Sequence, residues 1–306
     1  MTYFTIKKDY ALMKFLQHRW LQLIITIAVT VTLGILMFML TREQTVKVSV
    51  DQLNIRSAPT LRSKTVHKAK LNSRLVKIGE KNLWYHVRYD DEHTGWVASW
   101  LVNRRTNLKR ATNLSEATIV LDPGHGGNDS GALHTLDATK PSQMEKTYTL
   151  KVTKAIAADL RAHGAHVLMT RDDDTYVGLA PRPALANKID ADAFVSIHFD
   201  SSPEQNQSSG LTTYYYHKEL SYGLATSLNK QLNNYPMPNK GIEFGNFQVI
   251  RDNQRPAVLL EMGYINDSHD FKTISGVTYP LRVANSVTKG LNNYFAEDES
   301  GTKVGK

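Results

Sequence analysis

The sequence predicts an α/β domain with a central sheet flanked by helices, preceded by a small all-β barrel and one transmembrane helix. Three observations lead to this prediction. An uncharged apolar run lies near the N-terminus. Residues 46–104 show short alternating strand patterns without a helical period, and residues 118–296 alternate between strand-like and helix-like segments.

The apolar run covers residues 20–40 and has no charged side chain. As a helix it would be roughly 30 Å long, which matches the hydrocarbon core of a bilayer. Basic residues are concentrated before it: Lys7, Lys8, Lys14 and Arg19. The positive-inside rule therefore places residues 1–19 in the cytoplasm and the chain after residue 41 outside the cell, as in a single-pass cell-membrane protein. A cleaved signal peptide is the alternative, but the run ends in LMFMLTREQ, without the small residues of a cleavage site.

The amino-acid composition limits which metal ligands and which binding partners are possible. Because the chain has no cysteine, any bound metal must be held by His, Asp or Glu. The net charge of +8 is uneven, since residues 42–110 carry fifteen basic and six acidic side chains. Such a segment favours a polyanion, namely nucleic acid, anionic lipid or an anionic wall polymer, although a merely solvated surface is equally compatible. Nucleic acid is not expected as a partner, because binding it conflicts with export.

The segment 46–104 reads as a small barrel of short strands, with the alternating patterns VKVSV, RLVKIG, WYHVRY and GWVAS. Trp84, Tyr85 and Trp96 have aromatic rings that could stack on sugars or peptides, but in so small a barrel burial in the core is favoured. Residues 105–117 are polar and without periodicity, which predicts a linker.

Residues 118–296 contain the alternating elements of the α/β domain. Strands are predicted at TIVLD, HVLMT, AFVSIHF, GLTTYYYH, FQVI and AVLLEMGYI, and helices over residues 145–163, 179–189, 219–234 and 279–295. The last residues, 297–306, are predicted to be a flexible tail.

Two histidines are placed where ligands gather in such sheets. His125 lies in LDPGHGG directly after a strand, and His198 ends the strand VSIHFD. Ligands bind beyond the carboxyl ends of strands, so the two could share one site, although each alone could be a core histidine. Glu145 opens a predicted helix, where it could simply compensate the helix dipole. Glu261 lies in the apolar strand AVLLEMGYI, where an unpaired carboxylate is costly and should have a perturbed pKa suited to a general base.

Spacing alone does not bring these four residues together, but a family resemblance does. The motifs LDPGHGG, MEKTYTL, TRDDDTYVGLAPRPALAN, VSIHFD and RPAVLLEMGYINDSHD occur in this order. Over roughly 118–295 they resemble the type 3 N-acetylmuramoyl-L-alanine amidases. The run LNIRSAPTLRSKTV, followed by KNLWYHVRYDDEHTGWVASWLV, looks like a bacterial SH3 domain, a module that usually binds wall components.

The amidase resemblance implies that His125, Glu145 and His198 ligate Zn²⁺ and that Glu261 is the catalytic glutamate. It also implies hydrolysis of the amide bond between N-acetylmuramic acid and L-alanine in peptidoglycan. A non-catalytic wall-binding protein and a zinc hydrolase of another wall amide are the alternatives.

Two further residues bear on this prediction. Asp200 stands where the family usually has Asn, which removes an amide donor. His134 lies in the segment before Glu145 and is expected to be a surface histidine rather than a ligand.

Overall fold

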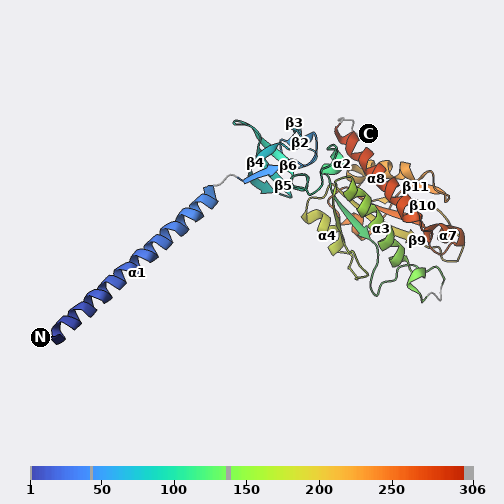
Figure 1. Cartoon of the computed structure of the whole chain (residues 1–306). Coiled ribbons are helices and arrows are strands. Elements are labelled where there is room, and N and C mark those ends of the chain that lie inside the picture. The colour runs from blue at the N-terminus through green and yellow to red at the C-terminus, as the bar shows by residue number, and fades with distance from the viewer. Residues whose placement is uncertain (1, 42–43, 136–138, 300–306) are drawn as a thin grey trace. The chain divides into compact units, whose positions relative to one another are not determined.

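The computed structural model describes residues 2–41, 44–135 and 139–299 (Figure 1). They fall into two compact units, Met1–Thr45 and Val46–Lys306.

The first unit consists mainly of helix α1, Thr2–Thr41, which contains the predicted transmembrane span. Its segment Arg19–Met37 is apolar and long enough to cross a membrane, and its side chains are exposed. Three hydroxyl groups in this segment donate hydrogen bonds to backbone carbonyls four residues earlier: those of Thr26, Thr30 and Thr32. These polar groups are therefore satisfied without water, as an apolar environment requires.

A six-stranded sheet follows α1, in the order β1-β4-β5-β6-β2-β3. Its strands are β1 (Gln44–Lys47), β2 (Leu53–Arg56), β3 (Thr65–Ala69), β4 (Arg74–Lys81), β5 (Trp84–Arg88) and β6 (Thr94–Ala98). The pairs β2/β3, β4/β5 and β5/β6 are antiparallel, and the short 3-10 helix η1 (Ser99–Leu101) follows β6. Trp84 belongs to the core of this domain, while Tyr85 and Trp96 pack against the core and stay partly exposed. The prediction of core burial is thus right for Trp84 and right in part for the other two.

The segment predicted as a linker contains a packed element. Helix α2 (Asn113–Glu116) begins after Thr112, whose side chain forms a capping box with Ser115. The carboxylate of Glu116 is buried and forms an ion pair with Arg56 of β2, at 2.6 Å between Nη2 and Oε2. A helix of four residues is too short to show a period in the sequence, so this element could not be recognised there.

The α/β domain is built on a second six-stranded sheet, in the order β11-β10-β12-β9-β7-β8. Its strands are β7 (Thr118–Pro123), β8 (His166–Met169), β9 (Ala193–Asp200), β10 (Leu211–Tyr215), β11 (Asn239–Phe244) and β12 (Ala257–Tyr264). β10 and β12 are antiparallel, and the other neighbours are parallel. The central sheet with flanking helices is the architecture that the sequence predicts.

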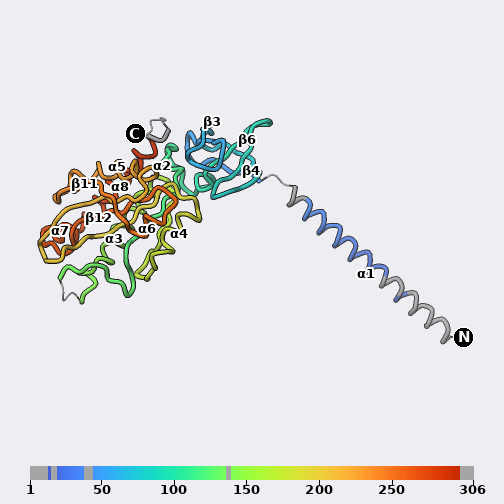
Figure 2. The backbone as a smooth tube through the Cα atoms, turned by 180° about the vertical axis from the view of Figure 1, so that it is seen from behind, coloured from blue at the N-terminus to red at the C-terminus, as the bar shows by residue number. Residues whose placement is uncertain are grey.

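Helices cover both faces of this sheet (Figures 1 and 2). Side chains of one face pack with α3 (Glu145–Ala162), α5 (Lys218–Asn229) and α8 (Tyr279–Glu299). Those of the other face, including Val120, Phe194 and Leu259, pack near α4 (Pro181–Lys188) and α6 (Gln248–Arg251). The remaining helices are η2 (Pro141–Gln143), η3 (Lys230–Leu232) and α7 (Ser268–Ile274).

All members of the three hydrophobic clusters lie between Val46 and Phe295, and none belongs to α1. One member of the α/β core, Leu61, comes from the loop between β2 and β3. Residues 46–299 therefore hold their own core and are expected to fold without α1.

Three predicted elements differ from the structure. The run FQVI is not a strand, because helix α6 begins at Gln248 and the edge strand is the more polar β11. Short apolar runs do not distinguish strand from helix, and polar edge strands carry a weak signal. The helix predicted over 219–234 ends at Asn229 and continues as η3. Helix α8 continues to Glu299, and residues 300–306 of the predicted tail lie outside the described residues.

Candidate active site

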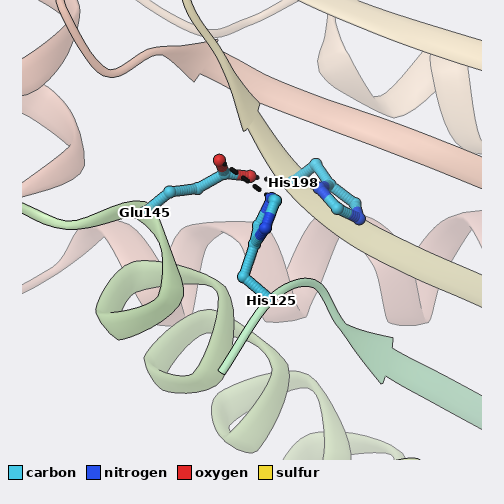
Figure 3. Close-up of side chains that lie close together, drawn as sticks. All are labelled: His125, Glu145 and His198. Carbon is cyan, nitrogen blue, oxygen red and sulfur yellow. Dashed lines mark hydrogen bonds and ion pairs between the residues drawn. The ribbon is translucent and has the colours of Figure 1, made fainter. Parts of the chain in front are cut away.

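Three side chains from distant parts of the sequence meet at one end of the α/β sheet (Figure 3). His125 lies in the loop after β7, Glu145 is the first residue of α3, and His198 lies in β9. One ligand atom of each lies within 4.8 Å of the others. The Glu145 carboxylate lies between the two rings: Oε2 is 3.0 Å from Nε2 of His125, and Oε1 is 3.1 Å from Nδ1 of His198. This donor set could hold a metal ion.

Two glycines make room for this cluster. A Cβ atom on Gly124 would overlap the ring of His198. A Cβ atom on Gly131 would lie 2.7 Å from Cδ2 of His125, and Gly131 has a φ of +65°, which favours glycine. His125 itself has a left-handed φ of 60°. The glycine-rich loop therefore serves close packing around the cluster as well as presentation of His125.

Asp129 orients His125. Its Oδ2 atom lies 2.9 Å from Nδ1 of His125, and its Oδ1 atom accepts a hydrogen bond from the backbone of Gly131. The contact engages Nδ1 and directs Nε2 toward Glu145, the arrangement that fixes the tautomer of metal-binding histidines. Burial by itself would lower the pKa of His125, but the neighbouring Glu145 and Asp129 carboxylates outweigh it and raise that pKa.

Two buried arginines hold the loop that carries His125. Arg171 donates to the carbonyl oxygens of Pro123, at 3.1 Å, and of Gly124, at 2.7 Å. Arg182 donates to the carbonyl oxygen of His125 at 3.1 Å and forms a 2.8 Å ion pair with buried Asp122. These two arginines were not predicted as site residues from the sequence. The sequence indicated them only by one arginine in TRDDD and one in APRPAL. These two stretches had been interpreted as parts of a family motif and of a predicted helix.

Glu261 lies next to the cluster, because it is in register with His198 across the parallel pair β9/β12. Its side chain is buried, and within the described chain its Oε2 atom has no hydrogen-bond partner. Burial raises the pKa of Glu261 well above its usual value, and the charges of Glu145 and Asp200 add to this. The structure thus has a buried carboxylate at this position, with one oxygen that lacks a partner among the described residues.

The two other residues singled out in the sequence lie close by. Asp200 ends β9, and its Oδ1 atom accepts a hydrogen bond from the Ser201 backbone. His134 is half-buried, contrary to the expectation of a surface residue, because its ring stacks on Phe271 at 3.7 Å and Nδ1 lies 2.9 Å from the carbonyl oxygen of Ile265. It is not part of the His–Glu–His cluster.

A second group of possible metal ligands comprises Asp267, His269 and Asp270. Its buried carboxylates already have structural partners. Asp267 caps helix α7, and Asp270 accepts hydrogen bonds from Ser209, Gly210 and Tyr264. This group ties loops together and offers little free ligand capacity.

Comparison with known proteins decides the family. Residues 119–293, more than half of the chain, match the family model described as N-acetylmuramoyl-L-alanine amidase. The chain belongs to the N-acetylmuramoyl-L-alanine amidase family. Residues 51–103 of the amidase match the bacterial SH3 domain.

Relatives of the amidase cover nearly the same length. It is 37% identical over 254 residues to the "Probable cell wall amidase LytH" of Staphylococcus saprophyticus, covering 81% of this chain and 83% of that protein. The protein of the same description from Staphylococcus epidermidis is 35% identical over 263 residues, covering 84% of this chain and 87% of the relative.

Solved structures agree for the catalytic domain. The catalytic domain of CwlV from Bacillus (Paenibacillus) polymyxa var. colistinus is 34% identical, with a TM-score of 0.55, over 59% of this chain and 98% of that one. AmiC2 of Nostoc punctiforme is also 34% identical, with a TM-score of 0.54, over 59% and 97%.

These findings make the protein an N-acetylmuramoyl-L-alanine amidase, a cell-wall hydrolase whose substrate is peptidoglycan. Its SH3 domain is a cell-wall-binding type, and its His–Glu–His cluster is consistent with a metal site. A cell-wall amidase acts outside the cell, and the apolar helix α1 is either an anchor or a signal.

Proposed function

We propose that the amidase is a zinc enzyme anchored in the cell membrane, with His125, Glu145 and His198 as the metal ligands and Glu261 as the catalytic acid–base. The donor set fits Zn²⁺, because two imidazole nitrogens and one carboxylate are ligands that zinc accepts. Three protein ligands leave an open coordination position, as in catalytic rather than structural zinc sites. When bound there, zinc would polarise the amide carbonyl and acidify a water molecule.

Glu261 is proposed to move the protons. It takes a proton from the attacking water and returns a proton to the departing amine of L-alanine. The bond that breaks is the amide between the lactyl group of N-acetylmuramic acid and L-alanine. Burial raises the pKa of Glu261, which favours a carboxyl group that can hold a proton between the two steps. The observation that supports this proposal is the register of Glu261 with His198, beside the possible ligands, together with the Glu261 Oε2 atom, which has no hydrogen-bond partner among the described residues.

The first test uses the fragment 44–306, which keeps the complete core. Purified peptidoglycan is digested with and without a zinc chelator, and the products are identified by mass spectrometry. Free stem peptides with an N-terminal L-alanine, lost on chelation and restored by zinc, are expected. Peptides cut internally would indicate another zinc hydrolase, and the absence of cleavage by a folded, zinc-loaded fragment would favour a binding protein.

The role of Glu261 is tested separately. Glu261→Gln keeps the shape of the side chain but removes the proton acceptor, so zinc binding should persist while hydrolysis is lost. A matched control is Glu204→Gln, which changes an exposed glutamate in the loop after β9. Retained turnover in Glu261→Gln would exclude Glu261 as the base.

The membrane topology is proposed on α1. The helix continues to Thr41, and basic residues are concentrated in its first half, so we propose that it is retained with its N-terminus in the cytoplasm. The mass of the protein extracted from membranes decides between anchor and signal. A mature chain beginning after residue 40 would identify α1 as a cleaved signal.

A further inference from the structure

We propose that the SH3 domain and the segment directly after it carry a second binding surface, around strand β1, for the phosphate headgroups of anionic membrane lipids. This inference rests on the proposed retention of α1 as a membrane anchor. It is independent of the catalytic chemistry.

The surface is defined by seven basic residues from three stretches of the chain, and we call it the entry patch. Its members are Lys47, Lys70, Arg74, Arg104, Arg105, Lys109 and Arg110. All are exposed except Arg104, which is half-buried. Within the part of the chain that the structure describes, none of the seven forms an ion pair with a carboxylate. Asp51 is the single acidic residue in the sequence ranges 44–51, 70–74 and 102–111.

Backbone hydrogen bonds bring the three stretches together around the first strand. Asn72 donates to the carbonyl oxygen of Val48 at 3.0 Å, which fixes the turn that carries Lys70 and Arg74. On the other side, Asn103 donates to Lys47 at 2.8 Å. Leu108 likewise donates to Ser49 at 3.0 Å, which holds the segment that carries the last four basic residues. Charges far apart in the sequence therefore gather at one place in the fold.

Apart from Asp51, the acidic residues of the SH3 domain lie outside the three stretches. Three of them, Asp90, Asp91 and Glu92, lie in the loop between β5 and β6, and β5 is separated from β1 by β4. A fourth, Glu80, is paired with Lys77 at 2.6 Å. The three stretches of the entry patch carry seven basic residues and one acidic residue, which is the excess of positive charge expected of a surface that binds a polyanion.

The position of the patch in the chain favours lipid headgroups as the polyanion. Only residues 42 and 43 separate the end of α1 from the start of β1 in the sequence. A chain of that length spans at most roughly 11 Å, which is comparable to the distance over which surface charges act at physiological salt. Anionic headgroups attract basic segments next to a membrane helix. Phosphodiester polymers of the wall offer the same chemistry, but they are not held close to the patch by the chain itself.

Vesicle binding of the fragment 44–306 tests the patch directly. We expect it to sediment with mixed phosphatidylcholine–phosphatidylglycerol vesicles, less so as salt rises, and not with phosphatidylcholine alone. The triple variant Arg74→Gln, Arg105→Gln, Lys109→Gln should bind about 10- to 100-fold more weakly. The matched control removes three exposed lysines from α3 and α8: Lys151→Gln, Lys154→Gln and Lys289→Gln. Unchanged binding of the first variant, or equal loss in the control, would overturn the proposal.

A second measurement uses the full chain in lipid nanodiscs. Because the protein has no cysteine, Thr106→Cys places a single fluorophore beside the patch, and Asn292→Cys places one on α8. Brominated phosphatidylglycerol should quench the first and not the second. Equal quenching at both positions would contradict the proposal.

Other outcomes are distinguishable from failure of the amidase function. Binding to purified wall that retains its phosphate polymers, without binding to vesicles, would replace lipid by wall polymer as the partner. Removal of α1 by processing would also overturn the proposal. Hydrolysis of a soluble muropeptide by the same variants reports on catalysis in either case.

Discussion

Arg56 and Glu116 form a buried ion pair, with side chains only 2% and 0% exposed, that joins the SH3 domain to helix α2. Leu114 of α2 belongs to the core of the amidase domain, so the pair couples the two domains. Arg56 also donates to the carbonyl oxygens of Leu61 and Ser63 and to the side chain of Asn113. Burial raises the pKa of Glu116, while Arg56 opposes that change. A charge at this position without its partner would be strongly destabilising.

The first prediction follows from that ion pair. Arg56→Met should lower the free energy of unfolding by about 3–5 kcal/mol, because it leaves the Glu116 carboxylate buried and unpaired. Arg56→Met combined with Glu116→Leu should recover much of this loss. Urea unfolding of fragment 44–306 measures both variants, and we expect one transition that includes both domains. Two separate transitions, or a loss below about 1 kcal/mol in the single variant, would contradict the coupling.

The second prediction concerns Gly124. A methyl group there would overlap the ring of His198, so Gly124→Ala should displace a proposed zinc ligand. Hydrolysis is expected to fall by about 100-fold, since a displacement of roughly 1 Å is enough for such a loss. The control is Gly178→Ala, whose new methyl group would meet only Pro181, at an ordinary 3.9 Å. Zinc affinity, measured by competition with a chelator, should fall only in the first variant.

The third prediction concerns the pH dependence of hydrolysis. After burial and the charge of Glu145, the charge of Asp200 also raises the pKa of Glu261. Asp200→Asn removes that contribution, so the pKa of Glu261 should fall. A general base works when deprotonated, and the acid limb of the rate profile should therefore move to lower pH. A limb that moves to higher pH, or does not move, would show that Asp200 does not act on the base.

The fourth prediction concerns stability and pH at a site remote from catalysis. Burial raises the pKa of Asp192 to about 6, although its carboxylate accepts a hydrogen bond from the Thr118 backbone. The folded state therefore holds a proton that the unfolded state releases, and stability should fall as the pH rises from roughly 4 to 6. Asp192→Asn can keep the hydrogen bond and should be about 1 kcal/mol more stable at pH 7. Denaturant titrations at pH 4 and pH 7 measure how the free energy of unfolding changes with pH. If Asp192→Asn loses as much stability between these pH values as the unchanged protein does, Asp192 is not the group responsible.

Much of the site could be anticipated from where each residue lies on its element. His125 and His198 follow apolar strands, and Glu261 is a charge within one, so each stands out in the sequence alone. Their assembly was not derivable from spacing, because the register of β12 with β9 is set by tertiary packing. The family resemblance of the ordered motifs supplied that step.

The supporting residues were harder to find for a physical reason. Arg171 and Arg182 bind backbone carbonyl oxygens. Because every residue has a carbonyl group, the sequence does not show which ones accept these hydrogen bonds. Helix α2 is too short to show a period, and its buried Glu116 looks like any polar residue until Arg56 is seen beside it. A strand was predicted at the apolar run FQVI, but this run forms helix α6, which packs against the core. The edge strand β11 is more polar and was not predicted.

Leu61 has a consequence for how this protein can be re-engineered. Domains joined by flexible linkers can be exchanged between enzymes, and many chimeras rely on this independence of the domains. Here a leucine of the SH3 domain completes the core of its neighbour. A chimera that carries a different wall-targeting domain would lack Leu61 and would have a cavity in the core of the amidase domain. Any successful exchange would have to transplant the β2–β3 loop or repair the cavity first.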